Sequence, residues 1–170
     1  MMNVKVSSPQ KIDSHLRDII KYLELDESKA VWMEVNKSNS FVPEPTFCHL
    51  NVMVKMGYEM GIPQFGWMLA QDKSMNFSEA QFHCVWKSPE GDLQDITPRL
   101  DNEKRVLFIP DDKRAIGLCY YENKPAINTF DNVRVLGNQY LTDLRRIKIV
   151  PETDMFEKYG IEFFWKASNK

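Results

Sequence analysis

The chain has 170 residues, with 22 Lys and Arg against 24 Asp and Glu, and 43% of its residues are hydrophobic. This length suits one domain, residues 1–170, with a substantial core. The near balance of charge excludes the strongly basic surface of a nucleic-acid-binding protein, and no apolar run is long enough to predict a membrane span. Three cysteines without disulfide-like spacing favour a reducing compartment, so we expect a cytoplasmic protein.

The predicted elements, taken in chain order, mix helices with short strands. Ser8-Pro9 is typical of a helix start, and an apolar stripe from Ile12 to Leu23 follows at helical spacing. Short apolar runs bounded by Gly, Pro and Asp favour strands further along. We therefore expect an α+β protein, with helices packed on a mainly antiparallel sheet. The predicted helices span residues 8–23, 48–57, 140–147 and 152–159, and the predicted strands span 30–35, 64–70, 79–86, 93–97, 106–109, 117–121 and 133–136.

Cys48 lies where a helix is predicted to begin. Thr46 is a suitable N-cap, apolar residues follow at helical spacing, and Gly57 is a plausible stop, so the nucleophile helix spans about 48–57. Unpaired N–H groups and the helix dipole in a first turn favour a thiolate, and the same N–H groups can stabilise an oxyanion. Cys48 is therefore a candidate nucleophile.

A histidine and an acid follow on a predicted hairpin, residues 79–97. Side chains alternate along a strand, so His83 shares a polar face with Glu79 and Gln81, while Cys84 and Trp86 lie on an apolar face that we assign to the core. Gly91 predicts a three-residue loop with a bulge.

The loop sets how His83 and Asp95 face each other. With Ser88 opposite Asp92, paired residue numbers sum to 180, which places His83 and Asp95 diagonally, about 7–8 Å apart at the backbone. A register that sums to 178 would place them directly opposite. Both registers put the two side chains on one face, as expected for a base and the carboxylate that orients it.

The hairpin also carries a family resemblance. His83-Cys-Val-Trp86 with the stretch Gly91 to Thr97 resembles the histidine-to-aspartate hairpin of transglutaminase-like proteins, part of the wider papain-like group, over residues 44–110. That group has the same order along the chain, Cys, His and Asp. The chain is similar as well to small bacterial and phage proteins with the patterns found here at Cys48 with Asn51, Gly66-Trp67, 79–86 and 95–98. The resemblance implies a papain-like core and a catalytic triad of Cys48, His83 and Asp95.

The mechanism that we expect is acyl transfer through a thioester on Cys48, with no cofactor. The substrate would be a peptide, a protein or a small amide, and the acceptor either water or an amine. Candidates for substrate binding or for the oxyanion are Asn51, Gln64, Trp67, Gln81 and Glu79. The sequence leaves the oligomeric state open.

Two alternatives remain open at this point. Thr46-Phe47 precede Cys48 where transglutaminases have Gly-x, so the protein could instead be a non-catalytic binding or inhibitor module on the same scaffold. A zinc-dependent hydrolase is the third hypothesis, because Cys48, His49, His83 and Cys84 have suitable ligand types. Their spacing does not match a zinc motif, and His83 and Cys84 point to opposite faces of a strand, so we predict no metal site.

Overall fold

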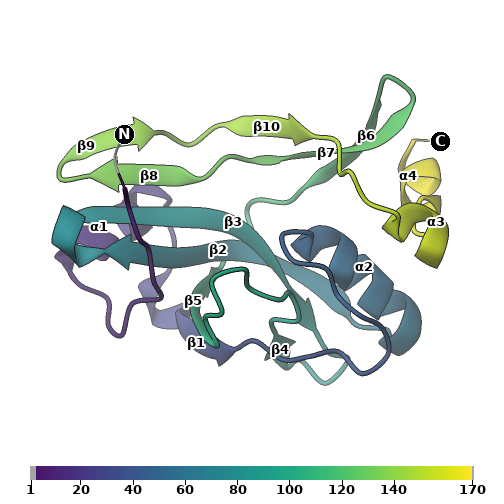
Figure 1. The fold of residues 1–170 in the computed structure, drawn as a ribbon, viewed down its shortest axis with the longest axis horizontal. Coiled ribbons are helices and arrows are strands. Elements are labelled where there is room, and N and C mark those ends of the chain that lie inside the picture. The colour runs from purple at the N-terminus through teal and green to yellow at the C-terminus, as the bar shows by residue number, and fades with distance from the viewer. Residues whose placement is uncertain (1–2, 170) are drawn as a thin grey trace.

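The computed structural model describes residues 3–169, and its architecture is the predicted α+β (Figure 1). A seven-stranded sheet has the order β1-β5-β2-β3-β8-β9, with β4 also paired to β3, and a three-stranded sheet has the order β10-β7-β6. The strand ladders in both sheets are antiparallel. Within residues 3–169, no helix is both long and apolar enough to cross a membrane.

The helices are α1 (Ser14–Tyr22), α2 (Cys48–Glu59), α3 (Met155–Tyr159) and α4 (Phe163–Ser168), with short 3-10 turns at Glu27–Lys29 and Lys73–Met75. The strands are β1 (Val31–Glu34), β2 (Ile62–Asp72), β3 (Phe77–Lys87), β4 (Leu93–Gln94), β5 (Arg105–Pro110), β6 (Gly117–Tyr121), β7 (Lys124–Phe130), β8 (Val133–Leu136), β9 (Gln139–Thr142) and β10 (Arg146–Ile149).

The long hairpin of β2 and β3 organises the core, and its two faces are both buried. On one face α1 packs against Trp67 and Leu69, and α2 packs beside it against Cys84 and Trp86. This is the face that the apolar alternation of β3 predicts. The other face, which carries His83, holds a separate apolar cluster of Met33, Met68, Val85, Val106 and Phe108. His83 is therefore not on a solvent-facing strand surface but in a second buried layer.

One edge of β3 is interrupted in its middle. Strand β8 pairs with β3 only as far as Ala80, and β4 pairs with it only from Trp86 onward. Within the described chain, residues 81–85 therefore have no strand neighbour on that edge. The start of α2 lies over this opening (Figure 1), so a side chain at the head of the helix can reach a residue on the far face of β3.

Several predicted boundaries are wrong. Residues 140–147 form strand β9 and the start of β10 rather than a helix, and β7 was not predicted. Tyr140, Leu141, Leu144 and Ile147 fit a helical spacing, but Leu144 lies in a bend and the other three belong to two four-residue strands, which are too short to show a period of two. Helix α1 begins at Ser14, where Asp13 accepts a bond from the Leu16 N–H and acts as the N-cap, instead of near Ser8. Helix α2 continues past Gly57 to Glu59.

We predict that Gly66→Ala destabilises the protein by about 3 kcal/mol, because overpacking forces backbone movement. A Cβ at Gly66 would lie 2.3 Å from the Ile109 carbonyl oxygen and 2.5 Å from the Phe108 ring. Urea unfolding measures the change in unfolding free energy. Gly57→Ala is the matched control, since a Cβ there meets no atom within 4 Å, and it should stabilise α2 by up to about 1 kcal/mol. Equal effects at the two glycines would contradict this packing account.

Candidate active site

Cys48 is the first residue of α2 and is buried. The predicted N-cap is wrong: Phe47 holds that position without a capping side-chain bond, while Thr46 has φ +69°. An N-cap residue needs an extended backbone, whereas Thr46 lies in the left-handed region that β-branched residues rarely adopt. This strained turn brings the chain abruptly into the helix, and strain of this kind occurs often at functional sites.

The structure brings His83 and Asp95 into direct contact. The His83 Nε2 and the Asp95 Oδ2 are 2.9 Å apart, and both side chains are buried. The Thr97 N–H donates to the other carboxylate oxygen at 3.1 Å, and the Asn36 N–H donates to the Asp95 carbonyl at 2.8 Å. With Nε2 engaged by Asp95, Nδ1 is the ring nitrogen left to face Cys48.

The hairpin has the register that sums to 180. Trp86 pairs with Gln94, and the Ser88 N–H donates to the Asp92 carbonyl at 2.8 Å around a loop that ends at Gly91, φ +96°. The returning strand is shorter than predicted, since β4 ends at Gln94. Beyond it Asp95 leaves β3 and forms a bridge with Val35 of the β1 segment. The shared face of His83 and Asp95 is nevertheless kept.

Cys48, His83 and His49 interact electrostatically. Burial alone would raise the pKa of the Cys48 thiol, but the charges of His49 and His83 and hydrogen bonds to their rings lower that pKa well below its ordinary 9.0. Burial opposes the charged form of His83 as well, yet Asp95 and the Cys48 thiolate raise its pKa to about 10. The arrangement therefore favours a thiolate–imidazolium pair at neutral pH.

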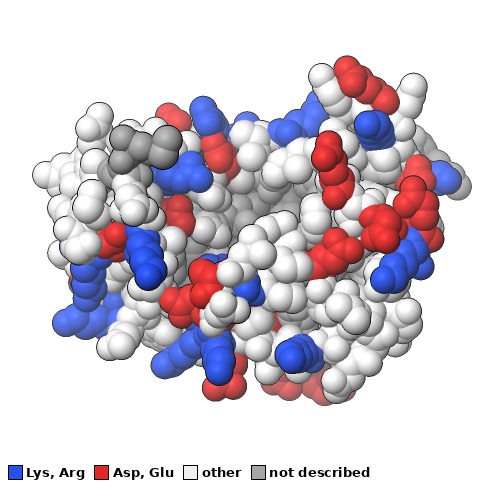
Figure 2. Space-filling view, viewed as in Figure 1, with Lys and Arg blue, Asp and Glu red and all other residues white. Residues whose placement is uncertain are grey.

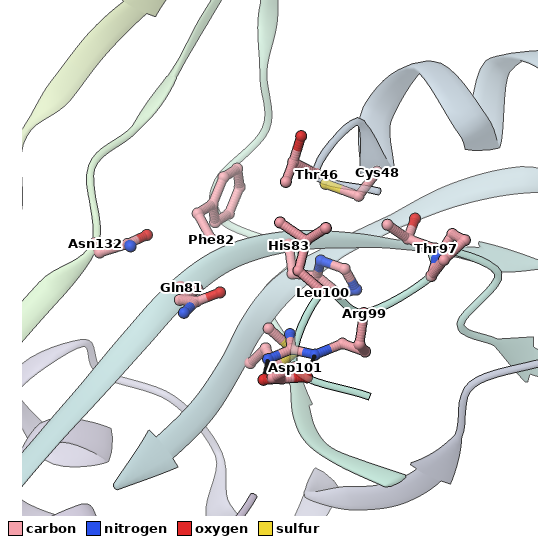
Figure 3. A pocket seen from close by; sticks show the side chains of 12 residues that line it. Thr46, Cys48, Gln81, Phe82, His83, Thr97, Arg99, Leu100, Asp101 and Asn132 are labelled. Atoms are coloured by element: carbon pink, nitrogen blue, oxygen red, sulfur yellow. Dashed lines mark hydrogen bonds and ion pairs between the residues drawn. The ribbon is translucent and has the colours of Figure 1, made fainter. Parts of the chain in front are cut away.

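A cavity of about 350 Å³ opens onto both Cys48 and His83, and we call it the histidine-side cavity. Figure 3 shows Cys48 and Thr46 on one side of the imidazole, with Leu100 in front of it. The space-filling view shows this face of the molecule hollowed near its centre (Figure 2). The cavity is lined by Thr46, Cys48, Met68, Gln81, Phe82, His83, Thr97, Pro98, Arg99, Leu100, Asp101 and Asn132.

Of the predicted binding residues, only Gln81 lines this cavity, and its amide donates to Glu79 at 2.6 Å. The other carboxylate oxygen of Glu79 lies 3.4 Å from the Arg134 guanidinium. Gln64 lies elsewhere, bonded to Asp112. Trp67 is in the core and donates to Asp111. These two side chains are committed to other partners, so they are not available to a substrate.

Asn51 connects neighbouring segments through hydrogen bonds and does not serve as an oxyanion donor. Its side chain is fully buried, accepts from the Glu44 N–H at 2.9 Å and donates to the Glu44 carbonyl at 2.8 Å and to the Thr97 hydroxyl at 3.1 Å. Both of its N–H donors are therefore used inside the protein. These bonds also tie the loop before Cys48 and the segment after Asp95 to the same helix, which fixes Cys48 and Asp95 relative to each other.

We predict that Asn51→Ala lowers the unfolding free energy by about 2–3 kcal/mol, because it removes three hydrogen bonds and leaves the part-buried backbone groups of Glu44 and the buried Thr97 hydroxyl without this partner. Thermal or urea unfolding gives the value. The exposed Asn36 supplies a matched control, and Asn36→Ala should change stability by no more than about 0.5 kcal/mol. Full stability in Asn51→Ala would rule out the bracing role.

Sequence reasoning missed the loop that closes the histidine-side cavity. Arg99 and Asp101 form an ion pair at 2.7 Å, and Arg99 also lies against the Met68 sulfur at 2.9 Å. Asn132 comes from the turn between β7 and β8. The only signal in the sequence was proximity to Asp95, since the contacts are set by the fold of residues 97–104 rather than by a motif.

Within residues 3–169, the His, Cys, Asp and Glu side chains form no group of three or more that could hold a metal ion. Comparisons of the chain with protein-family models, with curated protein sequences and with solved structures gave no match. What the site can do must therefore be argued from its own geometry.

The pKa shifts predict how Cys48 reacts with iodoacetamide. In the wild type the Cys48 thiolate should dominate at pH 7. The alkylation rate should therefore increase with pH only in the acid range and stay constant through neutrality. In His83→Ala the Cys48 thiol loses a group that lowers its pKa, so this pKa should rise. The alkylation rate at pH 7 should then fall roughly 10- to 100-fold. Peptide mass spectrometry measures the rate at each cysteine.

Cys84 is the internal control for this experiment, because burial, followed by the charges of Cys48 and Asp95, raises its pKa well above 9.0. It should stay unmodified in both proteins. A Cys48 rate that is the same in the wild type and in His83→Ala would show that His83 does not activate the thiol.

Proposed function

We propose that the protein is a cysteine-dependent acyl-transfer enzyme in which Cys48 is the nucleophile, His83 the general acid and base, and Asp95 the group that orients His83. The observation that carries the proposal is the buried bond between His83 Nε2 and Asp95 Oδ2, which turns the remaining ring nitrogen toward a thiol of lowered pKa. A nucleophile, a base and an orienting acid in contact are the parts that such chemistry needs.

The first half-reaction follows from these positions. The Cys48 thiolate attacks the substrate carbonyl carbon, and a sulfur–carbon bond forms. The carbon–nitrogen bond then breaks, and the amine leaves with the proton that His83 Nδ1 donates. In the second half, neutral His83 takes a proton from water or from an acceptor amine, which attacks the thioester and releases Cys48.

The oxyanion formed in each half-reaction needs N–H donors. The backbone N–H of Cys48, at the start of α2, is the donor nearest the reacting sulfur, since the first N–H groups of a helix have no partner within it. Among the side chains of the histidine-side cavity, Gln81 and Asn132 carry amides that can supply a second donor. Asn51 is excluded by its three internal bonds.

The family assignment is part of the proposal. The order Cys48, His83, Asp95, with the nucleophile at a helix start and the base on an antiparallel strand, supports relationship to transglutaminase-like and papain-like proteins. We also place the enzyme in the cytoplasm, a location that suits three free cysteines. The substrate would be a peptide, a protein or a small amide.

The direct test is to trap the thioester. Incubation with an activated acyl donor, quenching in acid and intact-mass measurement should give a single acyl adduct that peptide mapping places on Cys48. Cys48→Ala should give none, and Cys119→Ala, which removes a thiol far along the chain, should react as the wild type does. Asp95→Asn should slow acylation by at least ten-fold, since His83 loses the charge that keeps it protonated.

An adduct on Cys84 or Cys119 in place of Cys48 would refute the assignment of the nucleophile. Acylation of Cys48 at the same rate in Asp95→Asn would refute the role of the acid.

A further inference from the structure

Cys48 borders a second cavity on the side away from His83. This cavity is about 380 Å³ in volume, and we call it the strand-side cavity because β7 and β10 form its outer wall. Its lining shares Thr46, Cys48, Phe82 and Asn132 with the histidine-side cavity, but His83 is absent from it. The reactive sulfur therefore lies at the junction of two cavities, each large enough for a small organic group.

The outer wall of the strand-side cavity is an apolar surface built by cross-strand pairs. Ile127 of β7 is opposite Ile149 of β10, and Thr129 is opposite Ile147. Directly opposite residues share a face, and so do residues two apart on one strand, so these four side chains form one continuous patch. Phe47, Leu50, Phe82, Phe130 and Pro151 add further apolar surface around it.

The strand-side cavity offers little unbalanced charge. Its one carboxylate, Asp131, is bound by the Arg145 guanidinium at 2.6 Å. White, uncharged side chains predominate in the upper part of the hollow in Figure 2, beneath the strands β7 and β10 of Figure 1. Apart from that ion pair, the ionisable side chains of its lining are Cys48 and His49, so a charged group placed there would lose water for few partners, whereas an apolar group would gain contacts on several sides.

The position of His83 decides which part of a substrate each cavity holds. His83 must protonate the leaving amine, so the leaving group lies in the cavity that His83 lines. The acyl carbon is bonded to Cys48 in the intermediate, and its substituent must then extend away from the imidazole. His49 borders the strand-side cavity, but its Nδ1 has no hydrogen-bond partner within residues 3–169, so no acid orients that ring as Asp95 orients His83.

We propose that the strand-side cavity is the acyl-binding site, and that the enzyme prefers substrates whose acyl group is apolar and uncharged. This inference rests on the proposed function and adds a substrate class to it. The histidine-side cavity, which is lined by Arg99, Asp101, Gln81 and Asn132 among others, is more polar and accepts the leaving group.

The test uses p-nitrophenyl esters with one leaving group and different acyl groups: acetyl, butanoyl, hexanoyl and the anionic glutaryl. The rate of Cys48 acylation is followed by mass spectrometry and corrected with Cys48→Ala. Each methylene buried in the cavity should raise the rate about three- to four-fold, so butanoyl should react roughly ten-fold faster than acetyl. Glutaryl should react more slowly than butanoyl.

Two variants locate the preference. Ile147→Glu places a charge in the apolar patch and should abolish the increase with chain length, and Ile149→Lys, at a more exposed position of the same patch, should weaken it. Leu141→Glu makes the same apolar-to-acidic change on β9, outside the cavity, and should keep the wild-type dependence. Circular dichroism establishes that each variant is folded, and Ile149→Lys alone decides the point if Ile147→Glu does not fold.

The possible failures are distinguishable. If Cys48 reacts with no ester at a rate above that of a free thiol, the proposed function is wrong. If Cys48 is acylated but at equal rates for all four acyl groups, or if Ile149→Lys and Leu141→Glu behave alike, the acyl-site assignment is wrong while the nucleophile stands.

Discussion

The buried carboxylate of Asp95 is the group on which the arrangement of this site depends. A carboxylate without exposure to water is costly unless it is paired and hydrogen-bonded, and here His83 and the Thr97 N–H supply those bonds. The same pairing, together with the Cys48 thiolate, raises the pKa of His83 to about 10, and the resulting imidazolium helps to lower the pKa of Cys48. The contact between Asp95 and His83 thus influences the protonation of both His83 and Cys48.

The fold places the three groups together through an interruption in the sheet. Cys48 is the first residue of a helix on one face of β3, while His83 lies on the other face. Between the parts of β3 that pair with β8 and with β4, residues 81–85 have no strand neighbour on that edge. Asn51 ties α2 to Glu44 and Thr97, so the segments that carry Cys48 and Asp95 cannot shift independently. The opening also creates two cavities that meet at the sulfur.

The α+β class, the helix start at Cys48 and the hairpin register followed from the sequence, because each rests on local signals: apolar spacing, side-chain alternation and Gly91 in a short loop. The four-residue strands β9 and β10 did not, since they leave too little periodicity to read, and the seven-residue β7 was missed because Pro125 near its start weakens a strand pattern. The wall of the strand-side cavity was missed for these reasons. Asn51 was a candidate for substrate binding or for the oxyanion because it lies close to Cys48 in the sequence, whereas its bonds to Glu44 and Thr97 depend on tertiary packing.

The most direct measurement of the central claim is an NMR titration of the imidazole carbons between pH 5 and pH 11. The chain has three histidines, so the His83 signal can be assigned with single His→Asn variants. We predict that His83 stays protonated through neutrality and titrates near pH 10, and that its pKa falls in Asp95→Asn. A His83 that titrates near 6.5 in both proteins would contradict the thiolate–imidazolium pair, and with it the proposed mechanism.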